Sequence, residues 1–152
     1  MKIGIIGSGR VGYSMGKYMQ DHGIRVTGFY DRHRERALDA AQFTGTDSFD
    51  RIEDLVAASD TLFLTTSDGE IANVWDCIRH LSIQGKIICH FSGSLSSDLF
   101  TGREKKGVSA CSVHPMYAFS NRFTSYEQLN TVKLTIEGDP EAVAVFREIW
   151  NL

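Results

Sequence analysis

The sequence predicts a doubly wound α/β domain of three layers, with a mainly parallel sheet between two layers of helices. Short strands that are apolar throughout alternate with segments of helical periodicity, which is typical of a parallel sheet covered on both faces. A glycine-rich turn separates the first strand from the first helix. The length of 152 residues, with 42% hydrophobic and 23% charged residues, suits one globular domain. We therefore expect a single domain over 1–152.

The period of the apolar residues predicts the individual elements. Strands are expected at 3–6, 25–30, 46–49, 61–65, 86–91, 108–113 and 131–136. Helices are expected after the glycine turn, over 34–43, through 52–56, through 71–81 and from Pro140 onward. Asp139 has the position of an N-cap before Pro140. Ser67 and Glu70 have the spacing of a capping box at the start of the fourth helix.

The turn Gly7-Ser8-Gly9-Arg10-Val11-Gly12 fits the pattern GxGxxG and stands between a strand and an amphipathic helix. In that context the pattern indicates a dinucleotide-binding turn of the Rossmann type. Gly7 permits the tight turn, Gly9 leaves room for the pyrophosphate, and Gly12 allows the helix to pack closely on the strand. The N–H groups and the positive dipole end of the helix then face the phosphates. Arg10 is a candidate for an ion pair with them.

Asp31 ends the second strand, about 20 positions after Gly12, where an acidic residue accepts a hydrogen bond from the adenine ribose. A carboxylate there favours NAD, because it repels the 2′-phosphate of NADP. Arg32 and Arg34 favour NADP, since two guanidinium groups could hold that phosphate. Asp31 is also open to interpretation as the N-cap of the next helix. We expect NAD or NADP as the cofactor, with NAD favoured.

Ligands of an open α/β sheet bind outside the carboxyl ends of its strands, and polar residues follow three of the predicted strands. The candidates are Thr66 and Ser67 after the fourth strand, Ser92 and Gly93 after the fifth, and His114 at the end of the sixth. His114 could orient a substrate oxygen or act as acid or base, or it could be a structural histidine bound to the backbone. Gly93 allows close approach of a ligand, although turn chemistry alone could explain the neighbouring serines. Thr66 and Ser67 could equally belong to a helix cap.

Composition and motifs argue against several other classes. The net charge of −3 gives no case for nucleic acid or an anionic membrane as partner, and no apolar stretch approaches the roughly 20 residues that span a bilayer. Neither a metal-ligand cluster nor a hydrolase motif is present, so no metal site is expected. Cys77, Cys89 and Cys111 are sparse and widely spaced, which indicates reduced thiols and a cytoplasmic protein. Cys89 and Cys111 are expected to fill the core, and His90 to be a buried, hydrogen-bonded residue.

Several segments together resemble a known family. They are the glycine turn, 60–68, 90–97, the stretch Val113-His114-Pro115-Met116 with Phe119 beyond it, and 136–139. In this order they resemble the Rossmann-like oxidoreductases whose second half is a helical domain of unknown function. That group is similar to pyrroline-5-carboxylate reductases, deazaflavin-dependent NADP reductases and prephenate dehydrogenases.

The resemblance implies a role for each candidate residue. The glycine turn, Asp31 and Arg32 would bind the adenosine half of the cofactor. Thr66 and Ser67 would lie near the nicotinamide ribose. The nicotinamide and the substrate would face Ser92, Gly93 and His114.

The expected function is hydride transfer between the nicotinamide and a small carbonyl, imine or hydroxy-acid substrate. His114 would be the acid/base or substrate-orienting residue, and Ser92 a hydrogen-bond donor. Members of the family continue into the helical domain, which we expect to be absent from this chain. The alternative is a non-catalytic dinucleotide-binding or sensing module, or a fragment that needs a partner domain. A homodimer is also considered, since Phe146, Ile149 and Trp150 are expected to be partly uncovered.

Overall fold

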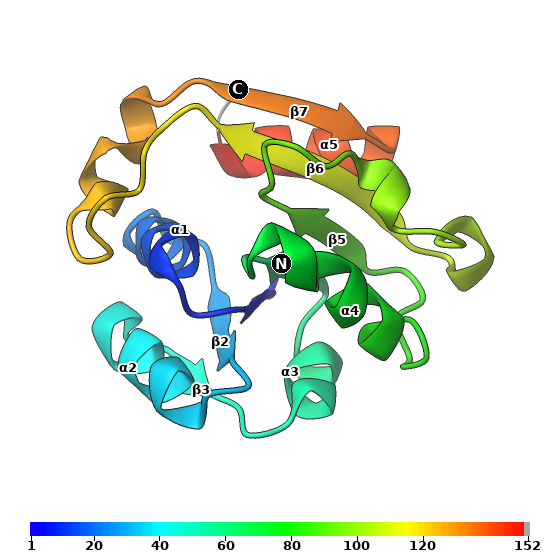
Figure 1. Cartoon of the computed structure of the whole chain (residues 1–152), viewed down its shortest axis with the longest axis horizontal. Helices are drawn as coiled ribbons and strands as arrows, with labels where there is room; N and C mark the ends of the chain where they lie inside the picture. Colours follow the sequence, from blue (N-terminus) through cyan, green and yellow to red (C-terminus); the bar gives the residue numbers. More distant parts are fainter. Residues whose placement is uncertain (151–152) are drawn as a thin grey trace.

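In the computed structural model, which describes residues 1–150, a seven-stranded sheet lies between helices on both of its faces (Figure 1). The strands stand in the order β3-β2-β1-β4-β5-β6-β7, and all neighbours are parallel except the pair β6 and β7. This arrangement confirms the doubly wound, mainly parallel fold. Within the described residues, every helix falls short of the length and apolar character that crossing a bilayer requires.

The elements lie close to their predicted positions. The strands are β1 (Ile3–Ile6), β2 (Val26–Tyr30), β3 (Asp47–Ser48), β4 (Thr61–Leu64), β5 (Ile87–His90), β6 (Ser109–Pro115) and β7 (Leu134–Gly138). The α-helices are α1 (Arg10–Asp21), α2 (Arg34–Thr44), α3 (Ile52–Ala58), α4 (Asp68–Ile78) and α5 (Pro140–Trp150). Three short 3-10 helices, η1 (Ser97–Leu99), η2 (Glu104–Lys106) and η3 (Ser125–Thr131), lie in the connections.

Two hydrophobic clusters join the helices to the sheet. Helices α1, α2 and α5 pack on one face, where Phe146 is buried, and α3 and α4 pack on the other, where Trp75 is buried. Successive side chains of a strand point to opposite faces, so Ile5 belongs to the first cluster and Ile6 to the second. The central strands are therefore buried on both sides, which explains why they are apolar throughout.

The last helix is covered more completely than expected. Phe146, Ile149 and Trp150 are only 2%, 5% and 6% exposed. Trp150 stacks on Tyr18 of α1, with 4.8 Å between the ring centroids. The expectation of an uncovered hydrophobic patch on this helix is therefore wrong, because α1 and the sheet cover these side chains.

The start of α4 also differs from the expectation. Ser67 precedes the helix, as predicted, but its side chain makes no capping hydrogen bond. Glu70 turns toward Arg32, with 3.9 Å between the charged groups. The predicted capping box is therefore wrong, and the Ser67 hydroxyl stays exposed at the carboxyl edge of the sheet.

The chain leaves β1 through α1 on one face of the sheet and leaves β4 through α4 on the other (Figure 1). These neighbouring strands therefore have connections that diverge at their carboxyl ends. In a doubly wound sheet a crevice opens at such a point. The crevice is bordered by the ends of β1, β2 and β4.

Candidate functional site

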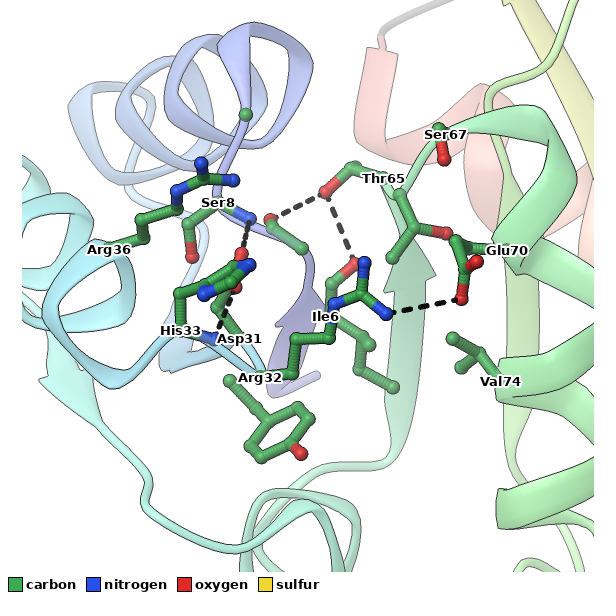
Figure 2. A pocket seen from close by; sticks show the side chains of 14 residues that line it. Ile6, Ser8, Asp31, Arg32, His33, Arg36, Thr65, Ser67, Glu70 and Val74 are labelled. Atoms are coloured by element: carbon green, nitrogen blue, oxygen red, sulfur yellow. Dashed lines mark hydrogen bonds and ion pairs between the residues drawn. The ribbon is translucent and has the colours of Figure 1, made fainter.

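A cavity of about 250 Å³ opens where the connections of β1 and β4 diverge (Figure 2). It is lined by the glycine turn, the residues after β2 and the residues after β4. The lining residues are Ile6, Gly7, Ser8, Gly9, Tyr30, Asp31, Arg32, His33, Arg36, Thr65, Thr66, Ser67, Glu70 and Val74. Most of the residues predicted to bind the adenosine half and the adjoining phosphates thus surround one cavity.

The three glycines of the turn have different structural requirements. Gly7 has a φ of +107°, and a Cβ there would lie 2.8 Å from the main-chain nitrogen of Thr66. A Cβ on Gly12 would collide with the carbonyl oxygen of Gly7. A Cβ on Gly9 would meet no atom within 4 Å. The fold therefore needs glycine at positions 7 and 12 but not at position 9, where a side chain would enter open space at the start of α1.

Helix α1 begins at this cavity without a capping side chain. Gly9 is the N-cap residue, and the first intrahelical bond runs from the N–H of Tyr13 to the carbonyl oxygen of Gly9 at 3.0 Å. The N–H groups before Tyr13 have no intrahelical partner. Uncapped N–H groups at a helix start favour an anion such as a diphosphate.

Two buried hydroxyl groups beside the cavity also lack partners. Ser8 is 4% exposed, and within residues 1–150 neither its Oγ nor the Oγ1 of Thr66 finds a hydrogen-bond partner. A buried hydroxyl left unpaired costs about 1–3 kcal/mol, so both groups would gain from a polar ligand. The residues present therefore fit the phosphate groups of a dinucleotide.

Three predicted cofactor residues lie farther along α1 and do not line the cavity. Arg10 is exposed and forms no ion pair within the described part of the chain. Val11 packs against the hydrophobic cluster beneath α1. Gly12 packs against Gly7 and Thr65. Val11 and Gly12 therefore offer a ligand only their main-chain N–H groups, whereas an ion pair of Arg10 with a phosphate stays a prediction.

The carboxylate of Asp31 is held by two main-chain N–H groups. Its Oδ2 accepts from Ser8 at 2.9 Å, and its Oδ1 accepts from His33 at 2.8 Å. His33, not Asp31, is the N-cap residue of α2. The interpretation of Asp31 as that helix cap is therefore wrong, and its side chain instead ties the end of β2 to the glycine turn.

The basic residues after β2 do not all face the cavity. Arg32, His33 and Arg36 line it, whereas Arg34 turns away and pairs with Asp50 at 2.9 Å. Arg34 therefore does not line the cavity, contrary to its interpretation as a residue that could hold a 2′-phosphate, whereas Arg36, which was not predicted, does. Helical spacing could have shown this, because residues three or four apart share a face. Position 36 lies three residues after the N-cap His33 and on the same side of α2, whereas position 34 does not.

Ser92, Gly93 and His114 form a second group, at the ends of β5 and β6. A Cβ on Gly93 would lie 2.5 Å from Cε1 and 2.7 Å from Nδ1 of His114, so the imidazole fills the space beside the glycine. His114 is partly exposed, and no hydrogen bond within residues 1–150 involves its ring nitrogens. The interpretation of His114 as a histidine held by the backbone is therefore wrong. Both nitrogens remain available to a ligand.

Ser92 closes the turn after β5. Its Oγ accepts the N–H groups of Ser94 at 3.1 Å and Leu95 at 3.2 Å. The Oγ of Ser94 lies 3.3 Å from the Oγ of Ser92 and donates to the carboxylate of Asp68 at 2.9 Å. Turn chemistry thus accounts for the oxygen of Ser92, and its hydroxyl proton can go to Ser94 or to a ligand. This bond joins the first residue of α4 to the turn after β5, and the sequence did not predict the pairing because the two segments are distant in sequence.

The buried cysteines belong to the core. Cys89 and Cys111 are 1% and 0% exposed and lie opposite each other in the register of β5 and β6. Burial raises the pKa of the Cys89 thiol, which disfavours the reactive thiolate. The prediction that both residues fill the core is confirmed.

Comparison with solved structures shows the same fold in oxidoreductases. A provisionally assigned NADP oxidoreductase of Bacteroides fragilis has a TM-score of 0.85 at 20% identity, over 99% of this chain and 56% of its own. A reductive aminase of Aspergillus terreus has 0.79 at 19%, over 99% and 51%. The 3-hydroxyisobutyrate dehydrogenase of Mycobacterium tuberculosis has 0.78 at 17%, over 98% and 50%. This chain thus spans about half the length of these proteins, and at such identities the likeness shows the fold alone.

Comparison with family models adds a sequence relationship. No curated protein sequence matches the chain. Residues 1–84, more than half of the chain, match the model of an oxidoreductase family with an NAD-binding Rossmann fold. The matched region contains β1 to α4, and with them all the residues that line the cavity. The chain therefore belongs to this family of oxidoreductases with an NAD-binding Rossmann fold.

Proposed function

We propose that this domain holds a nicotinamide dinucleotide for hydride transfer to or from a small carbonyl, imine or hydroxy-acid substrate. The observation that carries the proposal is Gly9, a glycine that the fold does not need, at the uncapped start of α1. The nicotinamide of the bound cofactor supplies or accepts the hydride. The protein supplies orientation, hydrogen bonds and a proton.

In this proposal, residues at one end of the site bind the cofactor, and residues at the other end act on the substrate. At one end, the first N–H groups of α1 and the unpaired hydroxyl of Ser8 hold the diphosphate, while Thr66 and Ser67 lie toward the nicotinamide ribose. At the other end, His114 holds or releases a proton at the substrate oxygen or nitrogen. Ser92 donates its hydroxyl proton to the substrate or to the carboxamide of the nicotinamide.

For the choice of cofactor, we propose NADP(H) over NAD(H). Arg32, His33 and Arg36 line the cavity together, and Arg36 forms no ion pair within the described chain. The negative charge of Asp31 is partly balanced by the two N–H groups that it accepts. Arg32 faces the carboxylate of Glu70 at 3.9 Å, so Arg36 is the guanidinium that a 2′-phosphate would engage, in contrast to the preference for NAD that Asp31 suggested in the sequence.

Calorimetric titration with NADPH and NADH tests this choice. We expect tighter binding of NADPH, and a loss of about tenfold in NADPH affinity for Arg36→Met, since hydrogen bonds to charged groups contribute about 1.5–3 kcal/mol. NADH affinity should change little. Arg34→Met, two residues away but outside the cavity, is the matched control and should bind both as the wild type does. Tighter binding of NADH by the wild type would reject the choice of NADP.

A second candidate function is dinucleotide binding without catalysis by this chain alone. It is favoured by one observation, namely that neither Ser92 nor His114 lines the cavity at the glycine turn. A panel of small ketones, imines and hydroxy acids, followed through nicotinamide absorbance, separates the two functions. If the chain is catalytic, His114→Ala should lower turnover by at least about 10²-fold with cofactor affinity unchanged. Cofactor binding without turnover across the panel would favour the second function.

A further inference from the structure

His90 is a buried titratable residue at the end of β5 to which the proposed function gives no role. Its side chain is 0% exposed. Its Nδ1 accepts the main-chain N–H of Ser92 at 3.2 Å, and its Nε2 lies 3.0 Å from the carbonyl oxygen of Ser96. The prediction of a buried, hydrogen-bonded histidine is confirmed. The two partners, however, both belong to one short segment at the site.

These partners fix the proton on the ring. The N–H of Ser92 can only donate, so Nδ1 must be unprotonated. The carbonyl oxygen of Ser96 can only accept, so Nε2 must carry the proton. His90 is therefore a neutral imidazole in the Nε2–H tautomer, and it holds segment 92–96 at both ends.

Segment 92–96 in turn supports His114. Gly93 lies against the imidazole, since a Cβ there would fall within 2.5 to 3.0 Å of three of the ring atoms. Ser112, on the strand that carries His114, donates its hydroxyl to the carbonyl oxygen of Leu95 at 3.1 Å. A displacement of the segment would therefore change the surface on which the His114 ring rests.

We propose that His90 is a positioning residue, which holds segment 92–96 so that Gly93 sets the orientation of His114. His90 itself touches neither cofactor nor substrate. The catalytic meaning of this orientation rests on the proposed function of His114. The orientation itself does not, and it can be measured in the protein without any ligand.

Substitutions that each keep one of the two bonds test the proposal. His90→Asn keeps an acceptor near the position of Nδ1, whereas His90→Gln keeps a donor near the position of Nε2. His90→Leu keeps neither. The exposed His80 provides the matched control, His80→Asn. Long-range ¹H–¹⁵N NMR spectra of the histidine rings report the tautomer of His90 and the surroundings of His114 in each variant.

In the wild type we expect the Nε2–H tautomer at His90. The His114 ring signals should shift in His90→Leu and His90→Gln, and they should stay close to wild type in His90→Asn, which keeps the bond to Ser92. A merely structural role of His90 would not give different His114 signals in His90→Asn and His90→Gln. The comparison of these two variants therefore tests the proposal even if His90→Leu does not fold. An Nδ1–H tautomer, or identical His114 signals in all variants, would overturn the proposal.

Ligand binding provides a second arm. We expect His90→Gln to lower NADPH affinity about fivefold, because a displaced Ser92 would lose its proposed hydrogen bond to the nicotinamide carboxamide, and to leave the affinity for 2′-phospho-ADP-ribose unchanged. Equal losses for both ligands would overturn the proposal, because the effect would not be confined to the nicotinamide end. If the wild type binds neither ligand, the proposed function fails, and the NMR comparison still decides the role of His90.

Discussion

The main-chain N–H of Ser8 donates to the carboxylate of Asp31 across 2.9 Å, so the end of β2 is bonded directly to the glycine turn. The same carboxylate also accepts the N–H of His33. This relationship makes Asp31 a structural part of the turn as well as a candidate contact for the ribose. The two roles predict different effects of substitution.

We expect Asp31→Ala to lower the free energy of unfolding by about 1–3 kcal/mol, because the N–H of Ser8 loses its acceptor in a part-buried position. Urea denaturation measures this change. Asp50→Ala removes the exposed partner of Arg34 and is the control, with an expected effect of about 0–1 kcal/mol. Equal effects of the two substitutions would contradict the structural role of Asp31.

Gly9→Val should abolish most of the affinity for the dinucleotide while the protein stays folded. A side chain at position 9 meets no protein atom within 4 Å but enters the space beside the N–H groups of α1. Calorimetry should show a loss of at least about tenfold, which corresponds to roughly 1.4 kcal/mol, and thermal unfolding should change little. Gly12→Val is the counterpart, expected to destabilise the fold because its side chain would collide with Gly7. Unchanged binding by Gly9→Val would exclude this turn as the diphosphate site.

Gly93→Ala should displace the His114 imidazole, because a Cβ would lie 2.5 Å from Cε1 of the ring. We expect the His114 signals to move in NMR spectra and turnover to fall. Affinity for an ADP-ribose fragment should persist, since that part of the site lies at the glycine turn. Gly69→Ala, where a Cβ meets nothing within 4 Å, is the control and should leave all three properties unchanged. An unmoved His114 ring in Gly93→Ala would contradict the described contact.

The ion pair between Arg103 and Asp139 predicts a dependence of stability on pH. Arg103 donates to both oxygens of Asp139, at 2.7 and 3.0 Å, and these bonds hold the pKa of the carboxyl below its ordinary value of 3.8. A carboxyl with a lower pKa in the folded than in the unfolded state stabilises the fold above its unfolded pKa. That contribution disappears as the pH falls through the folded pKa.

Asp139→Asn should therefore be less stable than the wild type by about 1–3 kcal/mol near neutral pH, since it loses the charge on these bonds. The difference should narrow as the pH falls below about 4. Urea denaturation at several pH values measures it. A difference that stays constant from neutral to acid pH would show that the charge of Asp139 contributes nothing.

The sequence predicted the elements well because their signals are local. Apolar runs and helical spacing record which side chains are buried, so even the two-residue strand β3 was expected within 46–49. The glycine turn could be predicted for a similar reason, since phosphate binding at such a turn depends on the backbone and on the absence of side chains.

The directions of polar side chains could not be predicted in the same way. Glu70 has the position of a capping-box residue, but its side chain turns to Arg32, which lies far away in the sequence. The covering of Trp150 by Tyr18 likewise joins opposite ends of the chain. Tertiary packing determines such partners, so no local pattern of the sequence predicts them.

The different demands at Gly7, Gly9 and Gly12 have an evolutionary consequence. A descendant that no longer needed a dinucleotide would still require glycine at positions 7 and 12 to keep its backbone in place, whereas position 9 would be free to change. Drift in such lineages should begin at that one position. A homologue with an intact fold and a large residue there would then be a former binder rather than a current one.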